Sequence, residues 1–361
     1  MRKVRVELGR DSYDIFIGVG LAGELEAFVK SAGFSRKALI VSDSHVGPLY
    51  GERLKHTLFH AGLDAELYMI PAGEISKSLS EAERLFTCAI ENGLDRKSPV
   101  FALGGGVVGD LAGFVASSYM RGVPFVQIPT SLLAQVDSGV GGKVAVNHAL
   151  GKNLIGAFYQ PKAVFMEMES LKSLPEREIS TGLGEVVKYG VIYDEEFFRF
   201  LETHQREVLS LEPETLMHVI ARSCEIKAEV VSQDEKESGL RRILNFGHTM
   251  AHAIEEETGY QRYNHGEAVA IGMMGAAYIS EMLGCVGADT VLRLEKLLRA
   301  MKLPVRAGGC TVEHMYRSVF RDKKTVNGKV NWVLMDEIGK VHVDGNVPES
   351  IVREAMGKCL D

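Results

Sequence analysis

The first half of the chain alternates short apolar runs with stretches of helical period. "VRVEL" and "YDIFIG" predict a starting hairpin. Four further apolar runs predict strands at 37–43, 65–74, 98–106 and 123–131. Between them, hydrophobic residues recur at helical spacing over 46–60, 78–92 and 107–118. Strands that alternate with helices in this way predict a parallel sheet with helices on both faces.

After about residue 175 the pattern becomes largely helical. Apolar positions recur with helical period near 176–190, 213–234, 246–258, 265–283 and 288–301. A short hairpin within "VNWVLMDEIGKVHV" follows, and then a last helix. We therefore predict two domains, an α/β domain over residues 1–174 and a mostly α-helical domain over residues 175–361.

Composition narrows the class of protein. The chain has 361 residues, of which 46% are apolar and 25% charged, as in ordinary globular enzymes. Its formal charge of −7 argues against a nucleic-acid partner, and no apolar run is long enough for a membrane span. The five scattered cysteines contain no C-x-x-C, and "MRKVRVELGRDSYDIF" has no export pattern. We expect free thiols and a cytoplasmic protein.

A glycine triplet lies between a predicted strand and a predicted helix. "FALGGGVVGD" places Gly104, Gly106 and Gly109 in the G-x-G-x-x-G spacing, where backbone N–H groups at a helix start can bind a pyrophosphate. The usual acid about twenty residues later is absent, but Asp43 and Glu74 end two earlier strands and could reach a ribose. These features indicate a dinucleotide site of unusual form, with simple turn glycines as the alternative.

The stretch "SLLAQVDSGVGGKVAVNHALGKNLIGAF" sets polar residues in an apolar, glycine-rich segment. These residues are Asp137, Lys143, Lys152 and Asn153. Glycines let the backbone approach a ligand closely, and a lysine ammonium suits a phosphate. The segment is typical of an anion site, with a solvated surface loop as the alternative.

Three histidines fall within eighteen residues of the helical half. His248 and His252 are one helical turn apart, and His265 opens the next apolar stretch. Glu185 lies in an apolar setting with Lys188 one turn later, and a buried carboxylate needs a cation or a metal. One carboxylate and two histidines form the ligand set of many catalytic zinc centres. Spacing alone leaves a metal site and ordinary core or surface histidines both open.

The ordered motifs resemble the 3-dehydroquinate synthase family of the shikimate pathway over nearly the whole chain. They are "PAGEISKS", "GGGVVGD", "IPTSLLAQVDSGVGGKVAVN", "GKNLIGAFYQP", "GLGEVVKYG", "LNFGHTMAHAIE", "NHGEAVAIGM" and "RDKK". The resemblance implies an NAD-binding α/β domain and a helical domain that binds metal and substrate. It also implies a homodimer with one divalent metal, commonly Zn²⁺ with Co²⁺ as a substitute, and a small-molecule substrate.

The resemblance assigns residues by motif. It implies the metal ligands Glu185, His248 and His265, and leaves His252 for proton transfer. The implied NAD site comprises Asp43, Glu74, Lys77, Gly105, Gly106, Val107, Asp110, Thr130, Ser131, Lys143 and Lys152. The implied catalytic and substrate residues are Asp137, Lys143, Asn153, Lys188, Lys227, Arg241, Asn245, Lys324 or its neighbour Lys323, and Arg121 from the other subunit.

The implied reaction converts 3-deoxy-D-arabino-heptulosonate 7-phosphate into 3-dehydroquinate and phosphate, as a carbon–oxygen lyase. Transient oxidation of a metal-polarised hydroxyl by NAD acidifies the neighbouring C–H, so that phosphate leaves by elimination. Re-reduction, ring opening and an intramolecular aldol step then close the carbocycle, and NAD is regenerated. Two alternatives share many of these features, a related sugar-phosphate cyclase that makes an inosose or a valiolone, and a metal-dependent polyol dehydrogenase. Arg241 and the "RDKK" lysines favour a substrate with a carboxylate.

Overall fold

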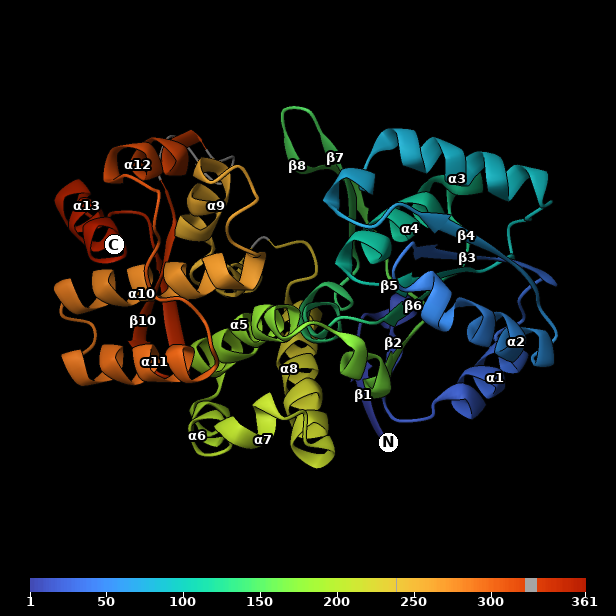
Figure 1. Cartoon of the computed structure of the whole chain (residues 1–361), viewed down its shortest axis with the longest axis horizontal. Helices are drawn as coiled ribbons and strands as arrows, with labels where there is room; N and C mark the ends of the chain where they lie inside the picture. The colour runs from blue at the N-terminus through green and yellow to red at the C-terminus, as the bar shows by residue number, and fades with distance from the viewer. Residues whose placement is uncertain (238, 322–329) are drawn as a thin grey trace. The chain divides into compact units, whose positions relative to one another are not determined.

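The computed structural model describes residues 1–237, 239–321 and 330–361 and divides them into two compact units (Figure 1). The first unit comprises Met1–Leu174 and Lys227–Glu235, and the second comprises Pro175–Ile226 and Lys236–Asp361. The last turns of α8 (Pro213–Gln233) therefore belong to the first unit, whereas a division of the sequence after residue 174 assigns all of this helix to the second.

In the described part of the chain, the first unit is built on a seven-stranded sheet with the order β1-β2-β9-β6-β5-β3-β4. The strands are β1 (Arg2–Val6), β2 (Tyr13–Gly18), β3 (Lys37–Asp43), β4 (Asp64–Ile70), β5 (Val100–Gly104), β6 (Phe125–Pro129) and β9 (Ala163–Glu167). Only the β1–β2 hairpin is antiparallel among these neighbours. The carboxyl ends of β3, β4, β5 and β6 therefore meet at one edge, where open parallel sheets bind ligands.

Helices cover both faces of this sheet, as the alternating pattern predicts. They are α1 (Ala22–Ser31), α2 (Glu52–His60), α3 (Leu79–Glu91) and α4 (Gly106–Ser118). Figure 1 shows α3 and α4 on one face and α1 and α2 on the other, and each pair closes its own apolar core. The start of α3 is fixed by Ser78, whose hydroxyl accepts a hydrogen bond from the Glu81 N–H at 3.2 Å.

Two strand regions differ from the sequence-based expectation. The glycine-rich segment forms a hairpin of β7 (Lys143–His148) and β8 (Gly151–Phe158), and β9 inserts between β2 and β6. Val144 and Val146 are buried in the core beneath α4, so this hairpin packs against the unit through one face. Neither strand alternates regularly between apolar and polar residues, because β7 has three consecutive apolar residues and β8 contains two glycines, so the sequence pattern does not predict them.

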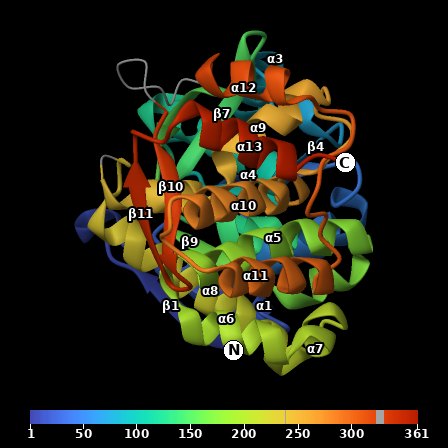
Figure 2. The ribbon, with the colours of Figure 1, turned by 90° about the vertical axis from the view of Figure 1, so that its left-hand side faces the viewer.

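The second unit is mostly helical. Its helices are α5 (Glu176–Tyr193), α6 (Glu195–Thr203), α7 (Gln205–Leu209), the first part of α8, α9 (His248–Glu257), α10 (His265–Met282), α11 (Ala288–Ala300), α12 (Val312–Arg321) and α13 (Glu349–Lys358). The unit also contains an antiparallel hairpin of β10 (Trp332–Glu337) and β11 (Lys340–Asp344), and β10 packs against α10. Figure 2 shows α10 in the middle of this unit, where it contacts α5, α9, α11, α13 and β10. The predicted fold class, an α/β half with a parallel sheet and a helical half, is confirmed.

Glycines allow α10 to pack unusually close to its neighbours. A methyl group added to Gly266 would overlap the carbonyl oxygen of Thr181 in α5, and one added to Gly272 would overlap the carbonyl oxygen of Gly247 at the start of α9. Gly247 itself has φ +79°, a conformation that favours glycine. The backbones of α5, α9 and α10 are therefore held in direct contact. Among the described residues, no helix is long and apolar enough to cross a membrane.

Candidate functional site

Among the described residues, three groups from three helices of the second unit converge on one point. Glu185 lies in the middle of α5, His248 is the first residue of α9, and His265 is the first residue of α10. One ligand atom from each lies within 4.8 Å of the others. The Nε2 atoms of His248 and His265 are 3.5 and 3.6 Å from Glu185 Oε1. The predicted ligands therefore lie together with their donor atoms facing one another.

Hydrogen bonds on the far side of each imidazole orient the two histidines. His248 Nδ1 is 3.1 Å from the carbonyl oxygen of Phe246, and His265 Nδ1 is 3.2 Å from Oε1 of the buried Glu255. Both partners are hydrogen-bond acceptors, so Nδ1 is the donor in each contact and Nε2 lies on the side of Glu185. This is the arrangement of metal-binding histidines in proteins.

The helix starts hold these side chains in place. Asn264 caps α10 in a reciprocal capping box with Glu267, and the N–H of Asn264 donates to Glu267 Oε2 at 2.8 Å. Arg177 from α5 ion-pairs with the same carboxylate at 2.7 Å. His265 therefore begins its helix on a fixed N-terminus that is tied to α5, the helix that carries Glu185.

The environment of Glu185 fits a cation. Its side chain is completely buried, and neither carboxylate oxygen has a hydrogen bond of regular geometry. The ammonium of Lys188, one turn later and 1% exposed, forms an ion pair with it. A buried carboxylate with two imidazole nitrogens in reach is a suitable donor set for a divalent ion such as Zn²⁺ or Co²⁺.

His252 lies beside this cluster but outside the group of three. Its ring is edge-on to that of His248, with ring centroids 5.8 Å apart. Arg241 and Asn245, which precede α9, are also in this unit; Arg241 is 1% exposed, and Asn245 Nδ2 donates to Glu237 Oε1 at 2.6 Å. Lys323 and Lys324 lie outside the described residues. The structure thus brings His252 next to a predicted metal ligand.

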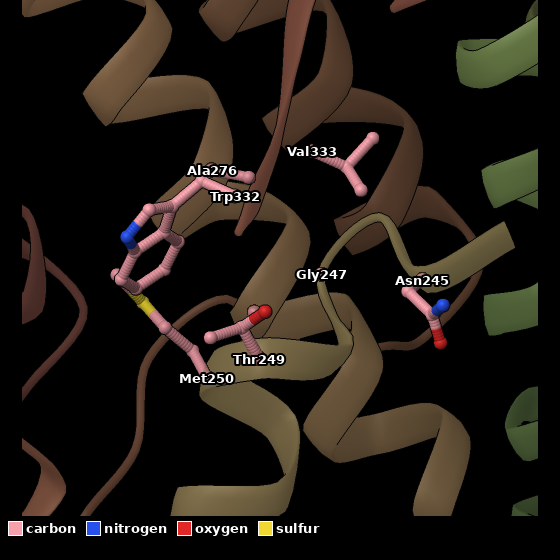
Figure 3. A pocket seen from close by; sticks show the side chains of 8 residues that line it. Asn245, Gly247, Thr249, Met250, Ala276, Trp332 and Val333 are labelled. Carbon is pink, nitrogen blue, oxygen red and sulfur yellow. The ribbon is translucent and has the colours of Figure 1, made fainter. Parts of the chain in front are cut away.

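A narrow cavity borders Asn245 but is too small to hold a water molecule. It is lined by Asn245, Gly247, Thr249, Met250, Gly272, Ala276, Trp332 and Val333. Figure 3 shows the Trp332 indole beside Met250, with Asn245 on the other side of the cavity. The void is a packing gap behind the start of α9 and not a ligand site, because a ligand pocket is several hundred cubic ångströms in volume.

In the first unit, the predicted nucleotide residues follow the carboxyl ends of neighbouring parallel strands. Asp43 ends β3, Glu74 follows β4, Gly105 and Gly106 join β5 to α4, and Thr130 and Ser131 follow β6. Asp43 Oδ1 accepts hydrogen bonds from the N–H groups of His45 and Val46 at 2.8 and 2.9 Å. Glu74 Oε1 accepts one from Asn147 Nδ2 at 2.7 Å. Both acids therefore have fixed positions near the edge where a dinucleotide would bind.

The glycine-rich N-terminus of α4 has the backbone arrangement of a phosphate-binding loop. Gly105 is its N-cap and Gly106 its first residue, so free N–H groups of the first turn lie at the sheet edge. A Cβ atom at Gly106 would lie 3.0 Å from Ser138 Oγ and fill this space. One turn later, Asp110 forms an ion pair with the buried Lys77. Burial raises the pKa of the Asp110 carboxyl, and the Lys77 ammonium opposes that shift.

The lysine-rich segment is divided between the hairpin and the turn before it. Lys143 begins β7 and is exposed, whereas Lys152 and Asn153 lie in β8. Asn153 has φ +55°, and its N–H donates to Asn147 Oδ1 at 3.0 Å. Asp137 in the turn ion-pairs with Lys227 of α8 at 2.7 Å.

Arg121 stands at a strained turn after α4. Met120 and Arg121 have φ values of +48° and +70°, a conformation that residues other than glycine seldom adopt, and Arg121 is exposed. Backbone strain of this kind concentrates at functional positions.

Glu255 and the glycines beside the ligands were not predicted from the sequence. Glu255 is the first of three consecutive glutamates in "HAIEEE", and nothing in that run distinguishes the buried one except its spacing from the apolar face of α9. Gly184, Gly247 and Gly266 each adjoin a predicted ligand in sequence and lie at a close helix contact. The adjacency of glycine to each ligand is a signal that the sequence does contain.

Comparison with known proteins gives consistent matches along the chain. Residues 67–181 match the family model for the N-terminal part of 3-dehydroquinate synthase, and residues 182–325 match the model for its C-terminal part. A 3-dehydroquinate synthase of Desulforamulus reducens is 48% identical over 359 residues, which cover 99% of this chain and 100% of the relative.

Solved structures of two related cyclases are similar over the full length. 2-Epi-5-epi-valiolone synthase of Streptomyces hygroscopicus, with NAD⁺ and Zn²⁺ bound, is 28% identical with a TM-score of 0.89 and covers 98% of this chain and 97% of its own. A 2-deoxy-scyllo-inosose synthase complexed with carbaglucose-6-phosphate, NAD⁺ and Co²⁺ is 25% identical with a TM-score of 0.90 and covers 99% and 100%.

Proposed function

The chain belongs to the 3-dehydroquinate synthase family, and on that premise we propose that it converts 3-deoxy-D-arabino-heptulosonate 7-phosphate into 3-dehydroquinate and phosphate. NAD and one divalent metal ion are its cofactors, as in the two cyclase structures that contain them. Phosphate leaves by cleavage of a C–O bond without hydrolysis, which makes the enzyme a carbon–oxygen lyase.

The observation that carries this proposal is the cluster of Glu185, His248 and His265. Both imidazoles direct Nε2 towards a buried carboxylate while Nδ1 is held by an acceptor, as a metal site requires. Glu185, His248 and His265 would hold the ion, and the strand ends that carry Asp43 and Glu74 would hold NAD. When bound, the metal and NAD supply Lewis-acid polarisation and a reversible two-electron oxidation at a secondary hydroxyl.

The basic residues of the chain bind the two anionic ends of the substrate. Lys143, Lys188 and Asn153 bind the phosphate, because a lysine ammonium is a compact charge that suits it. Arg241 and Lys323 or Lys324 bind the carboxylate, which suits the paired N–H donors of arginine. Gathering these few cations around the substrate lets a chain of net charge −7 bind a ligand that is anionic at both ends.

His252, Asp137, Lys227 and Asn245 position the substrate and move protons. His252 adjoins the ring of His248 and can exchange a proton with the hydroxyl that is oxidised. Asp137 holds Lys227 in place through their ion pair, so that this ammonium has a fixed position from which to contact the substrate. The substrate's own phosphate takes the proton from the carbon beside the new ketone, and the aldol closure needs mainly orientation.

A related cyclase activity is the second candidate, because the two similar structures are those of a valiolone and an inosose synthase. A related cyclase of this type would take a substrate that lacks the carboxylate, as does the carbaglucose-6-phosphate in the inosose synthase structure. The 48% identity to a 3-dehydroquinate synthase and the buried Arg241 favour the carboxylate substrate. The test is phosphate release from three substrates: the heptulosonate 7-phosphate, glucose 6-phosphate and sedoheptulose 7-phosphate. We expect turnover with the first alone, and turnover with either of the others would assign the related activity.

The proposed enzyme is a homodimer in which Arg121 completes the substrate site of the partner copy. The strained, exposed turn at Met120 and Arg121 supports this role, since such strain persists where it serves binding. Its location is the cytoplasm, where the five cysteines, none of which forms a disulfide in the described part of the chain, stay reduced.

A further inference from the structure

A second pair of histidines lies on the surface of the first unit, on a helix that the proposed reaction does not use. His56 and His60 are one turn apart in α2, and both are exposed. Their Nε2 atoms are 3.2 Å apart, and their ring centroids are 4.3 Å apart at an interplanar angle of 73°. The two rings therefore meet edge to face and share one hydrogen bond between their Nε2 atoms.

We propose that His56 and His60 form a second metal site, which takes a transition-metal ion that prefers imidazole nitrogen, such as Ni²⁺, Cu²⁺ or Zn²⁺. The distance between the donor atoms carries this proposal. Two nitrogens bound to one ion at about 2.0–2.1 Å are about 3.4 Å apart at a tetrahedral angle and about 2.9 Å apart at a right angle. The observed 3.2 Å lies between these values. An ion can replace the shared proton with little movement of either ring.

The surroundings of the pair are compatible with a cation. His60 is the last residue of α2, and the carbonyl groups at a helix C-terminus favour positive charge. The two cationic side chains of the same helix, Arg53 and Lys55, each interact with a carboxylate on another element. Arg53 Nη1 is 3.9 Å from Glu169 Oε2, and Lys55 contributes to the charge around Asp64. Exposure leaves the remaining coordination positions to water, so we expect moderate affinity.

The experiment compares Ni²⁺ binding by the metal-loaded protein in calorimetry. The wild type should bind one more ion than His56→Ala or His60→Ala, or bind it with an affinity at least tenfold higher, because the second imidazole of a chelate acts at high effective concentration. A matched variant exchanges Lys55 and His56 (K55H with H56K). It keeps both histidines but separates them by five residues, on different helix faces, and should bind as weakly as the single variants.

Two further proteins distinguish this site from others. His314→Ala removes an exposed histidine outside the pair and should bind Ni²⁺ as the wild type does. His265→Ala removes a ligand of the other cluster and should keep the additional ion. Equal Ni²⁺ binding by the wild type and the exchange variant would overturn the proposal, and so would loss of the additional ion in His265→Ala. Because these side chains lie at the surface, the variants at positions 55, 56, 60 and 314 should share the wild-type melting temperature, which confirms that they are folded.

Discussion

His265 Nδ1 lies 3.2 Å from Oε1 of Glu255, a carboxylate that is 6% exposed and was not predicted as part of the site. The two residues come from consecutive helices, α9 and α10. A carboxylate that accepts a hydrogen bond from a ligand imidazole fixes the ring and increases its basicity. Glu255 therefore acts on the proposed metal through His265.

We expect Glu255→Gln to lower metal affinity by about 10- to 100-fold, because the amide is a weaker acceptor that can also turn a donor towards the ring. Competition with a chelator of known affinity measures this. Glu256→Gln is the control, since Glu256 is exposed and accepts a hydrogen bond from the Ser318 hydroxyl instead of from His265. Unchanged metal affinity in Glu255→Gln would show that the contact with His265 has no positioning role.

The two histidines near His248 should differ when each is replaced. His265→Ala should lose the metal and all activity, because a three-ligand site tolerates loss of a ligand poorly. His252→Ala should keep the metal and lose rate by about 10²–10⁴-fold, the usual contribution of a proton-transfer group. Metal analysis of both purified proteins decides between these roles. Equal metal loss in the two would mean that His252 is itself a ligand.

The glycine at the contact between α5 and α10 should be essential to stability. Gly266→Ala would place a methyl group against the Thr181 carbonyl, and we expect a loss of about 1–3 kcal/mol or more of folding free energy. Gly357→Ala in α13 is the matched control. A Cβ there meets nothing within 4 Å, so helix propensity should raise stability by about 0.5–1 kcal/mol. Thermal unfolding of the two variants should therefore shift in opposite directions.

The basic residues should separate into two sets when the substrate is shortened. An analogue without the carboxylate should bind wild type and Arg241→Ala about equally weakly. In the wild type, Arg241 then has no substrate carboxylate to bind, so its removal costs no further affinity. The same analogue should lose further affinity with Lys143→Ala, by about 2–5 kcal/mol for a charged contact. Calorimetric titration of the three proteins measures this. If Arg241→Ala weakens the short analogue as much as the full substrate, the assignment of the carboxylate to Arg241 is wrong.

The sequence predicted those parts of the molecule whose structure depends on residues that are neighbours along the chain. Strand β3 begins and ends at the predicted residues 37 and 43, because its apolar run is buried on both faces and ends in an acid. The proposed ligand set also comes from motifs, since Glu185 and His265 lie in stretches that the family resemblance identifies. The structure adds that their donor atoms meet.

What the sequence did not predict depends on contacts between distant segments. The strands of the β7–β8 hairpin lack a regular alternation of apolar and polar residues. Strand β9 is placed by pairing with β2 and β6, which lie far away in the sequence. The selection of Glu255 from three neighbouring glutamates requires knowledge of which side of α9 faces His265. The glycines at Gly184 and Gly266 are meaningful only once α5 and α10 are known to touch.

The central claim is that NAD oxidises the substrate and is regenerated in the same turnover. The most direct measurement follows inorganic phosphate and absorbance at the NADH band together, with the heptulosonate 7-phosphate as substrate and NAD and Zn²⁺ present. The account predicts many equivalents of phosphate per enzyme, while NADH stays below one equivalent throughout. NADH that accumulates in step with substrate consumption, without phosphate release, would contradict it and would indicate a dehydrogenase.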